Sequence, residues 1–126
     1  MYQNLSLFAA AQGRASYAAQ TQAVVTKNIA NADTPGYRAQ SLEPFRLDTT
    51  APRTGLRQTR AQHLAAQGGD LRFTTALRGG EMSPNGNDVS LEQEMVTAVA
   101  AKSQHDGALA VYRHGMTVLR TVLGRR

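Results

Sequence analysis

The chain has 126 residues, enough for one domain of modest size. Only 41% of the residues are hydrophobic and 6% are aromatic, and much of the apolar content is Ala, which buries little surface. A large globular core is therefore not expected, and stability should come from paired helices or from partners. The absence of Cys excludes disulfide bonds and thiolate metal sites.

The net charge of +5 is concentrated in the middle of the chain. Residues 38–78 contain seven Arg and three acidic residues, so 7 − 3 = +4 of the charge lies there. Basic charge can indicate binding to nucleic acid or anionic lipid. These Arg are scattered, without Lys clusters or interleaved aromatic residues. We therefore interpret the segment as solvated and partner-facing, and keep a nucleic-acid-binding module as an alternative.

Neither a membrane span nor a secretory signal is expected. No stretch approaches the roughly 18 consecutive apolar residues that a transmembrane helix needs. The N-terminus also lacks the basic start and apolar core of a cleavable signal peptide. A protein of this kind would leave the cytoplasm, if at all, by another route.

A long helix is predicted over residues 3–31. Small and apolar residues recur with a strict 4,3,4,3 spacing, which is typical of a helix that packs against a partner helix. The positions are Asn4, Phe8, Ala11, Ala15, Ala18, Gln22, Val25, Ile29 and Ala32. The Ala residues in the centre would permit close approach of the partner backbone.

A turn is predicted directly after this helix. Thr34 precedes Pro35, which biases it away from helical backbone angles, and Pro35 cannot donate a backbone hydrogen bond. Pro35-Gly36 fits the central positions of a type II turn, in which Gly accepts a positive φ. Tyr37 then leaves the helix end at a fixed angle. The residues alone are compatible with a simple helix cap or with an aromatic anchor for assembly.

The middle of the chain differs in composition. Residues 40–87 contain six of the eleven Gly and three of the four Pro, with few large apolar residues. We expect this segment to be partly disordered in the free protein. The alternation of Leu71, Phe73, Thr75 and Leu77 predicts a short strand, and a small β-hairpin packed on the helices is the competing interpretation.

A second helix is predicted from Asp88 or Ser90 onward. Ser90 and Gln93 have capping-box spacing, and acidic residues in the first turn favour a helix start. The same 4,3,4,3 spacing runs through Leu91, Met95, Ala98, Lys102, His105, Leu109, Tyr112, Met116, Leu119 and Leu123. Gly107 and Gly115 lie eight residues apart near one face; they either permit tight packing or weaken the helix.

The chain offers little that could support catalysis. His63, His105 and His114 share no metal-binding i,i+4 spacing. Glu92 and Glu94 diverge on a helix and do not form an acid–base pair. Phosphate-binding glycine loops and nucleophilic serine turns are also missing from the sequence. We expect no enzyme activity, no metal and no cofactor.

The residues described above resemble the bacterial flagellar rod and hook proteins. In that family the N-terminal helix ends in Ala-Asn-x-x-Thr-x-Gly-Tyr, which residues 30–37 match. The short chain, the segment 39–45, the mid-chain Leu56, Thr59 and His63-Leu64, and the segment 85–95 are similar to a short proximal rod protein. Within segment 85–95, Ser90 replaces the usual acidic residue of that pattern.

The resemblance implies a mostly α-helical fold in which the N- and C-terminal helices pair as an antiparallel coiled coil. The expected division is residues 1–37 for the first helix and turn, 38–87 for the mobile middle, and 88–126 for the last helix; the first and third form one helical domain. The implied function is that of a structural subunit of the proximal rod, the drive shaft of the flagellar basal body. The neighbouring short rod subunit and a soluble helical adaptor of flagellar assembly are the alternatives.

The resemblance also assigns roles to residues. An assembly motif is expected at Asn28, Ala30, Asn31, Thr34, Pro35, Gly36 and Tyr37. The helix-pairing seam is expected to consist of Phe8, Val25, Ile29, Leu91, Met95, Leu109, Tyr112, Met116 and Leu119. Expected partners are other copies of the chain, other rod proteins, and membrane-ring and export-gate proteins at the rod base, without nucleic acid. The expected location is the periplasmic rod, reached by flagellar type III export without a cleaved signal.

Overall fold

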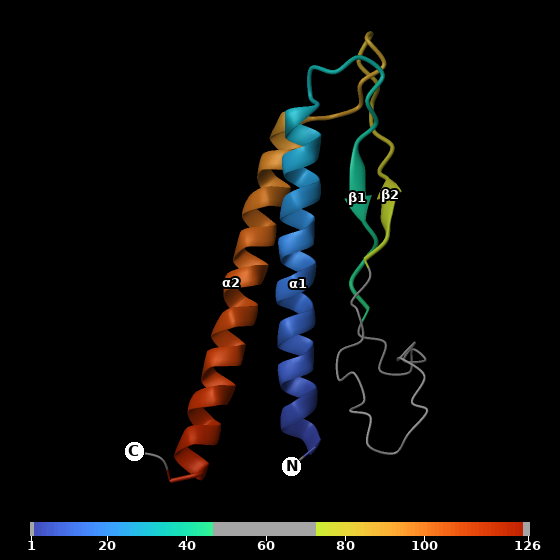
Figure 1. The fold of residues 1–126 in the computed structure, drawn as a ribbon. Coiled ribbons are helices and arrows are strands. Elements are labelled where there is room, and N and C mark those ends of the chain that lie inside the picture. The colour runs from blue at the N-terminus through green and yellow to red at the C-terminus, as the bar shows by residue number, and fades with distance from the viewer. Residues whose placement is uncertain (1, 47–72, 125–126) are drawn as a thin grey trace, which may run out of the picture.

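Two long helices dominate the computed structural model, which describes residues 2–46 and 73–124. The elements are α1 (Tyr2–Ala30), β1 (Gln40–Leu42), β2 (Thr75–Leu77) and α2 (Leu91–Val122). The helices lie side by side and antiparallel, and the two strands lie beside α1 (Figure 1). The prediction of a mostly helical protein with paired terminal helices is confirmed.

Both helix boundaries follow from local sequence signals. α1 ends at Ala30, close to the predicted end, and is followed by the Pro35-Gly36 turn. α2 begins at Leu91, where the Ser90 hydroxyl accepts a hydrogen bond from the backbone N–H of Gln93 at 3.4 Å. This is the capping contact that the Ser90–Gln93 spacing predicts.

The helices meet along a line of small side chains. The buried residues of α2 other than its first-turn Glu94 are Ala101, Ala108 and Gly115, seven residues apart. On α1 the corresponding buried residues are Ala11, Ala18 and Val25, with the same spacing. A seven-residue repeat keeps one face of a helix toward its partner. Small residues at these positions allow the two backbones to approach closely.

The observed contact line differs from the predicted seam. Val25 is buried, and Phe8, Leu109, Met116 and Leu119 are half-buried. Three other predicted seam residues, Ile29, Leu91 and Met95, are exposed at the surface of the chain, and Tyr112 is partly exposed although its ring packs on Phe8 of α1.

The cause is a rotation of α2 toward its smallest side chains. Met95, Leu109 and Met116 each follow a buried residue by one position, which is a rotation of about 100° around the helix axis. Heptad spacing does not distinguish a row of large residues from an adjacent row of small ones. The smaller row faces α1 because it permits the closer contact.

Aromatic packing closes the end of the helix pair where α1 begins. The ring centroids of Phe8 and Tyr112 are 5.2 Å apart in an edge-to-face arrangement. A Cβ added at Gly115 would lie 3.0 Å from the Phe8 ring. Of the two interpretations of the glycines, Gly115 therefore permits tight packing, whereas Gly107 has nothing within 4 Å of the same added atom.

A two-stranded antiparallel sheet lies against α1. Gln40 pairs with Leu77 and Leu42 with Thr75. Past the strands, the aromatic rings of Phe45 and Phe73 pack on Tyr17 of α1, with centroid distances of 5.6 and 5.4 Å. A short hairpin packed on the helices, which the sequence left as one of two interpretations, is thus present at the ends of the middle segment.

Part of the middle segment lies outside the described residues. The predictions for Leu71 and for the mid-chain residues Leu56, Thr59 and His63-Leu64 fall between residues 47 and 72. In the described ranges, neither helix has an apolar stretch of the length and hydropathy that a membrane-spanning helix requires.

Candidate functional site

Four polar side chains are buried near the end of the helix pair where α1 ends and α2 begins. They are Asn28, Asn87, Asp88 and Glu94, and none is more than 6% exposed. We call this group the polar junction. Burial of polar groups costs free energy unless they are hydrogen-bonded, so their partners define what the junction holds together.

Asn28 joins α1 to the sheet. Its amide nitrogen donates to the backbone carbonyl of Gln40 at 2.8 Å, and its amide oxygen accepts from the backbone N–H of Gln40 at 3.1 Å. The side chain therefore satisfies the backbone of β1 as a neighbouring strand would. The exposed Lys27 adds a hydrogen bond to the side-chain oxygen of Gln40 at 3.1 Å.

Tyr37 extends this connection to the turn. Its hydroxyl donates to the Asn28 amide oxygen at 3.2 Å. Burial, followed by the negative charges of Glu94 and Asp88, raises the pKa of Tyr37 above 10.0. The hydroxyl stays protonated at neutral pH and remains a donor. The predicted aromatic anchor is thus half-buried and hydrogen-bonded within its own chain.

Asn87 caps the end of α1 from a distant part of the sequence. Its amide nitrogen lies 2.9, 2.8 and 2.8 Å from the backbone carbonyl oxygens of Asn31, Ala32 and Thr34. Its amide oxygen accepts from the backbone N–H of Val89 at 2.7 Å. Carbonyl groups at a helix C-terminus have no partner within the helix. The Asn87 side chain therefore donates hydrogen bonds to backbone carbonyls at the end of α1 and in the turn that follows it.

Asp88 binds the strand that follows the turn. Its carboxylate accepts hydrogen bonds from the backbone N–H of Ala39 and from Arg38 Nε, the latter at 2.8 Å. The Ala39 hydrogen bond, more than the contact with Arg38, lowers the pKa of Asp88 below 3.8 although burial opposes the shift. Asp88 is therefore ionised at neutral pH.

Glu94 completes the junction from the first turn of α2. Its fully buried carboxylate accepts a hydrogen bond from Arg78, which follows β2. Together, Arg78 and Arg38 provide two of the seven Arg of the basic middle segment, and both pair with carboxylates at the start of α2. Part of the positive charge that could have indicated nucleic-acid binding thus holds the chain together.

The turn has the conformation that the sequence predicts. Gly36 has φ +71°, which fits the third position of a type II turn, and the carbonyl of Thr34 accepts from the backbone N–H of Tyr37 at 3.3 Å. The backbone N–H of Gly36 donates to the carbonyl of Asn85 at 3.0 Å. The turn therefore also contacts the loop before α2.

The structure brings most of the expected assembly motif into this junction. Asn28 and Tyr37 are hydrogen-bonded inside it, and the carbonyls of Asn31 and Thr34 are acceptors for Asn87. Four members of the motif are exposed: Ala30, Thr34, Pro35 and Gly36.

The sequence placed Asp88 near the start of the second helix and an acidic residue, Glu94, in its first turn, but it predicted none of the contacts of Asn87, Asp88 or Glu94. Asn87 and Asp88 belong to segment 85–95, which carries part of the resemblance, but their contacts reach back about 50 residues. The hydrogen bonds of Asn87 and Asp88 span 49 to 56 positions. The hydrophobic periodicity of a helix or strand does not predict contacts between residues so far apart in the sequence.

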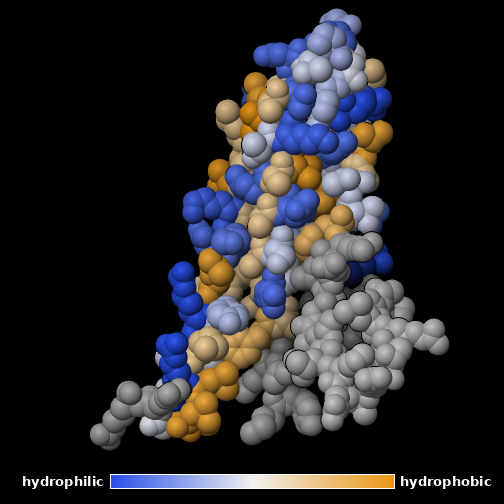
Figure 2. Space-filling model, in the orientation of Figure 1, coloured by the Kyte–Doolittle hydropathy of each residue, from blue (hydrophilic) through white to orange (hydrophobic). Residues whose placement is uncertain are grey.

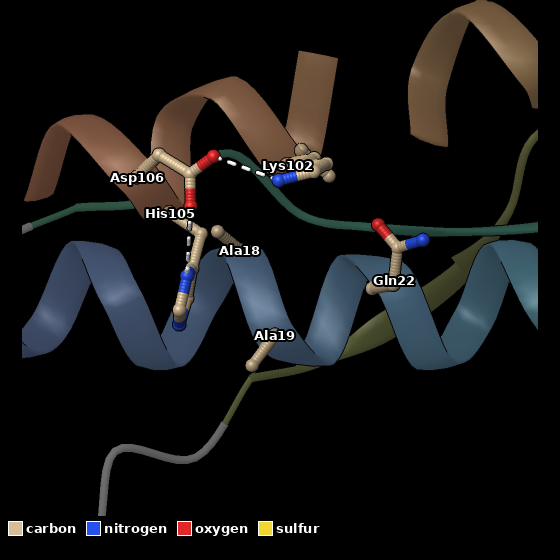
Figure 3. Close-up of a pocket in the computed structure, with 7 residues that line it drawn as sticks. Ala18, Ala19, Gln22, Lys102, His105 and Asp106 are labelled. Carbon is tan, nitrogen blue, oxygen red and sulfur yellow. Dashed lines mark hydrogen bonds and ion pairs between the residues drawn. The ribbon is translucent and has the colours of Figure 1, made fainter. Parts of the chain in front are cut away.

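A shallow groove of about 380 Å³ lies between the middles of the two helices (Figure 3). Its lining includes Ala18, Ala19, Gln22, Lys102, His105 and Asp106. Lys102 pairs with Asp106 at 2.9 Å, one helical turn away and largely exposed, so this ion pair contributes little to stability. We interpret the groove as the space left where small side chains face each other.

The ionised Asp88 should make stability depend on pH. A lowered pKa in the folded state means that the contribution of Asp88 is complete well above 3.8 and declines as pH falls through the folded-state pKa. We expect Asp88→Asn to reduce the free energy of unfolding at pH 7, and the difference between wild type and variant to shrink at about pH 3. Urea unfolding followed by circular dichroism measures both. An equal difference at the two pH values would contradict the assigned role.

The chain is similar in sequence to known flagellar proteins. The family described as flagella basal body rod protein matches residues 8–38, which span most of α1 and the turn. The chain is 32% identical over 112 residues to the flagellar basal body rod protein FlgB of Agrobacterium fabrum, covering 82% of each chain. It is 33% identical over 106 residues to the protein of the same name from Bacillus subtilis, covering 81% of each. The chain belongs to the FlgB family of flagellar basal body rod proteins.

Proposed function

We propose that the chain is a structural subunit of the proximal rod and transmits torque toward the hook and filament. The observation that carries this proposal is the identity to two FlgB proteins over about four fifths of the chain, which extends beyond the motif shared by rod and hook proteins. The neighbouring rod subunit FlgC and a soluble adaptor are not favoured by these relatives. The work of such a subunit is assembly and load bearing, not catalysis.

The proposal extends to location and partners. The chain would be exported by the flagellar type III apparatus without a cleaved signal and would join the rod in the periplasm. Its partners would be other copies, other rod proteins, and membrane-ring and export-gate proteins at the base. The small-residue helix contact supports this route, because a helix pair with few large buried side chains should unfold readily for passage through a narrow channel.

The junction suggests how the assembly motif acts. Asn28, Tyr37 and the carbonyls near Thr34 hold the turn, the sheet and α2 in one arrangement. We propose that the motif fixes the shape that neighbouring subunits recognise. The seam residues exposed in the single chain, among them Leu91 and Met95, would then be covered by neighbours.

Replacing Gly36 with Val tests the motif. Gly36 has φ +71° and nothing within 4 Å of an added Cβ, so the penalty would come from the backbone and not from a clash. A β-branched residue at positive φ costs about 1–3 kcal/mol. We expect weaker assembly and reduced swimming in soft agar. Gly124→Val is the matched control, because Gly124 also has positive φ and free space but lies at the end of α2. Normal motility of the Gly36 variant would count against the proposed role.

The proposed function is tested by locating the chain. The gene is deleted, a tagged copy is restored, and detergent-extracted basal bodies are purified and blotted. We expect the chain in the particle and loss of motility on deletion. If the chain stays in the soluble fraction while motility persists, the rod proposal is wrong and the adaptor becomes the better account.

A further inference from the structure

The loop that precedes α2 contains a chemically labile pair of residues, Asn85 and Gly86. Asn is among the least chemically stable residues in proteins. Of the five Asn residues of the chain, only Asn85 is followed by Gly. Because Gly has no side chain, its backbone nitrogen is unhindered and can approach the side-chain amide of the residue before it. Asn85 is therefore the Asn of this chain that is most easily attacked by the backbone.

The reaction at such a pair is a ring closure followed by hydrolysis. The Gly86 nitrogen loses its proton and attacks Cγ of Asn85. A C–N bond forms, the bond between Cγ and the side-chain nitrogen breaks, and that nitrogen takes up a proton and leaves as ammonia. Water then opens the resulting succinimide at one of its two carbonyl groups, which gives aspartate or isoaspartate at position 85. In isoaspartate the backbone runs through the former side chain and is one carbon atom longer.

Water and base can reach this loop. Asn85 is exposed, and Gly86 is half-buried. Figure 2 shows mostly hydrophilic residues at the surface of this end of the molecule, at the top of the view. Access of water therefore does not limit the reaction at this site.

The closed loop nevertheless engages both reacting groups in hydrogen bonds. The Gly86 N–H, which must lose its proton, donates to the backbone carbonyl of Ser83 at 2.8 Å. The side-chain oxygen of Asn85 accepts from the backbone N–H of Asn87 at 3.0 Å. Base removes the proton of a hydrogen-bonded amide only after that hydrogen bond opens, which is why such amides exchange slowly with solvent. The attack on Asn85 should therefore require the loop to open.

The polar junction holds this loop closed. The backbone carbonyl of Asn85 accepts from the N–H of Gly36 at 3.0 Å, and the Asn87 side chain is bound to the carbonyls at the end of α1. Gly86 has φ +79°, and a Cβ added to it would lie 3.5 Å from Gly36 Cα, so the loop and the turn after α1 are in close contact. The loop cannot open without separating from that turn.

We propose that Asn85-Gly86 is a site of spontaneous deamidation that the closed polar junction protects, and that the isoaspartate product prevents the junction from closing. The additional backbone carbon lies between Asn85, which contacts Gly36, and Asn87, which contacts the end of α1. Both contacts cannot then form together. A chain that folds promptly keeps Asn85, whereas a chain that stays open loses the ability to form the junction. The proposal does not depend on the proposed function.

The protection is tested on the full-length chain at neutral pH, in buffer and in concentrated urea. Peptide mapping by mass spectrometry and isoaspartate-specific methylation measure the conversion at position 85. We expect conversion in urea and a rate that is about tenfold lower or less in buffer. Hydrogen exchange of the Gly86 N–H is measured in parallel, because both reactions begin with loss of that proton. Deamidation should be slowed by at least the same factor as exchange. An equal rate in buffer and in urea would overturn the proposal.

Variants of the junction test what provides the protection. Asn87→Ala removes the side chain that binds the loop to the end of α1, and we expect deamidation of Asn85 in buffer to accelerate about tenfold or more. Asn31→Ala is the control, because its side chain makes only an exposed hydrogen bond to Lys27, and the rate should stay near that of wild type. A wild-type rate in the Asn87 variant would mean that the junction is not the protecting element. If that variant unfolds completely, the comparison of exchange with deamidation in the wild-type chain still decides.

The effect of the product is tested on the isoaspartate form, separated from the unmodified chain by ion exchange. Ala39 is the reporter, because its backbone N–H donates to Asp88 inside the junction. We expect its hydrogen exchange to lose protection in the isoaspartate form. Asn85→Asp is the matched control, since it carries the same charge on a backbone of normal length and can still accept from the Asn87 N–H. Unchanged protection of Ala39 in the isoaspartate form would show that the junction still closes, which would overturn that half of the proposal.

Discussion

Replacing Asn87 with Ala is expected to lower the free energy of unfolding by about 2–4 kcal/mol, although Asn87 lies in a loop and contacts no apolar core. Its amide nitrogen serves the carbonyls of Asn31, Ala32 and Thr34, and the side chain is only 2% exposed. Removing it leaves the Ala32 carbonyl without its donor and the Val89 backbone N–H without its acceptor, and each buried unsatisfied group costs about 1–3 kcal/mol. Urea unfolding followed by circular dichroism at 222 nm measures the loss.

Asn31→Ala is the matched control for this prediction. The Asn31 side chain also donates to a backbone carbonyl, that of Lys27 at 2.8 Å, but this hydrogen bond is exposed. Water can replace an exposed donor, so we expect a loss below about 1 kcal/mol. If both variants lost the same free energy of unfolding, the stability of the junction would not depend on the burial of Asn87.

The Asn87 variant should also show that the turn and the sheet can lose their arrangement while the two helices remain formed. The interhelical contact along Ala18 and Ala101 does not use Asn87. We therefore expect the variant to keep its helices at low temperature while the turn and sheet lose their fixed position. Such a chain should be defective in assembly even under conditions in which it remains folded.

Local signals were sufficient to predict the helices. Pro35-Gly36 ends α1, and Ser90 with Gln93 begins α2, because caps and turns depend on residues within a few positions of each other. Heptad spacing predicts that each helix packs against a partner helix, and the antiparallel pairing is what the resemblance to the flagellar rod and hook proteins implies.

The face of α2 that meets α1 could not be predicted in the same way. The heptad that contains Met95 and Met116 and the heptad that contains Ala101 and Gly115 have equal spacing, and a pattern based on hydrophobicity prefers the larger residues. Which face of α2 packs on α1 depends on how closely the two backbones can approach. That distance is set by the side chains of both helices together.

The polar junction could not be predicted from the sequence for a related reason, because its contacts join elements that lie far apart in the chain. Asn28 lies in a helix whose pattern assigns it to no apolar face, and Asp88 is a candidate start of the second helix in the sequence. Only the three-dimensional arrangement shows that Asn28 is hydrogen-bonded to the backbone of β1, and that Asn87 and Asp88 are hydrogen-bonded to the backbone on either side of the turn after α1. The motif at the end of α1 has the sequence of a helix cap, but it is one half of a contact whose other half precedes α2.

The substitutions Gly115→Leu and Gly107→Leu should change the free energy of unfolding in opposite directions. An added Cβ at Gly115 would lie 3.0 Å from the Phe8 ring, so Leu must displace that ring and force α1 and α2 apart. Overpacking of this kind costs about 1–3 kcal/mol, even after the gain in helix propensity. At Gly107 nothing lies within 4 Å of the added Cβ, and Leu should raise the free energy of unfolding by about 0.5–1 kcal/mol.

The comparison isolates the small-residue contact from helix propensity, since both sites are Gly, lie eight residues apart in α2 and receive the same side chain. Thermal and urea unfolding of the two variants measure the difference directly. A stabilising Gly115→Leu would mean that α2 turns a different face to α1, one on which Met116 and not Gly115 is covered. The expected loss instead ties the close approach of the helices to Gly115, whose added Cβ would meet the Phe8 ring of α1.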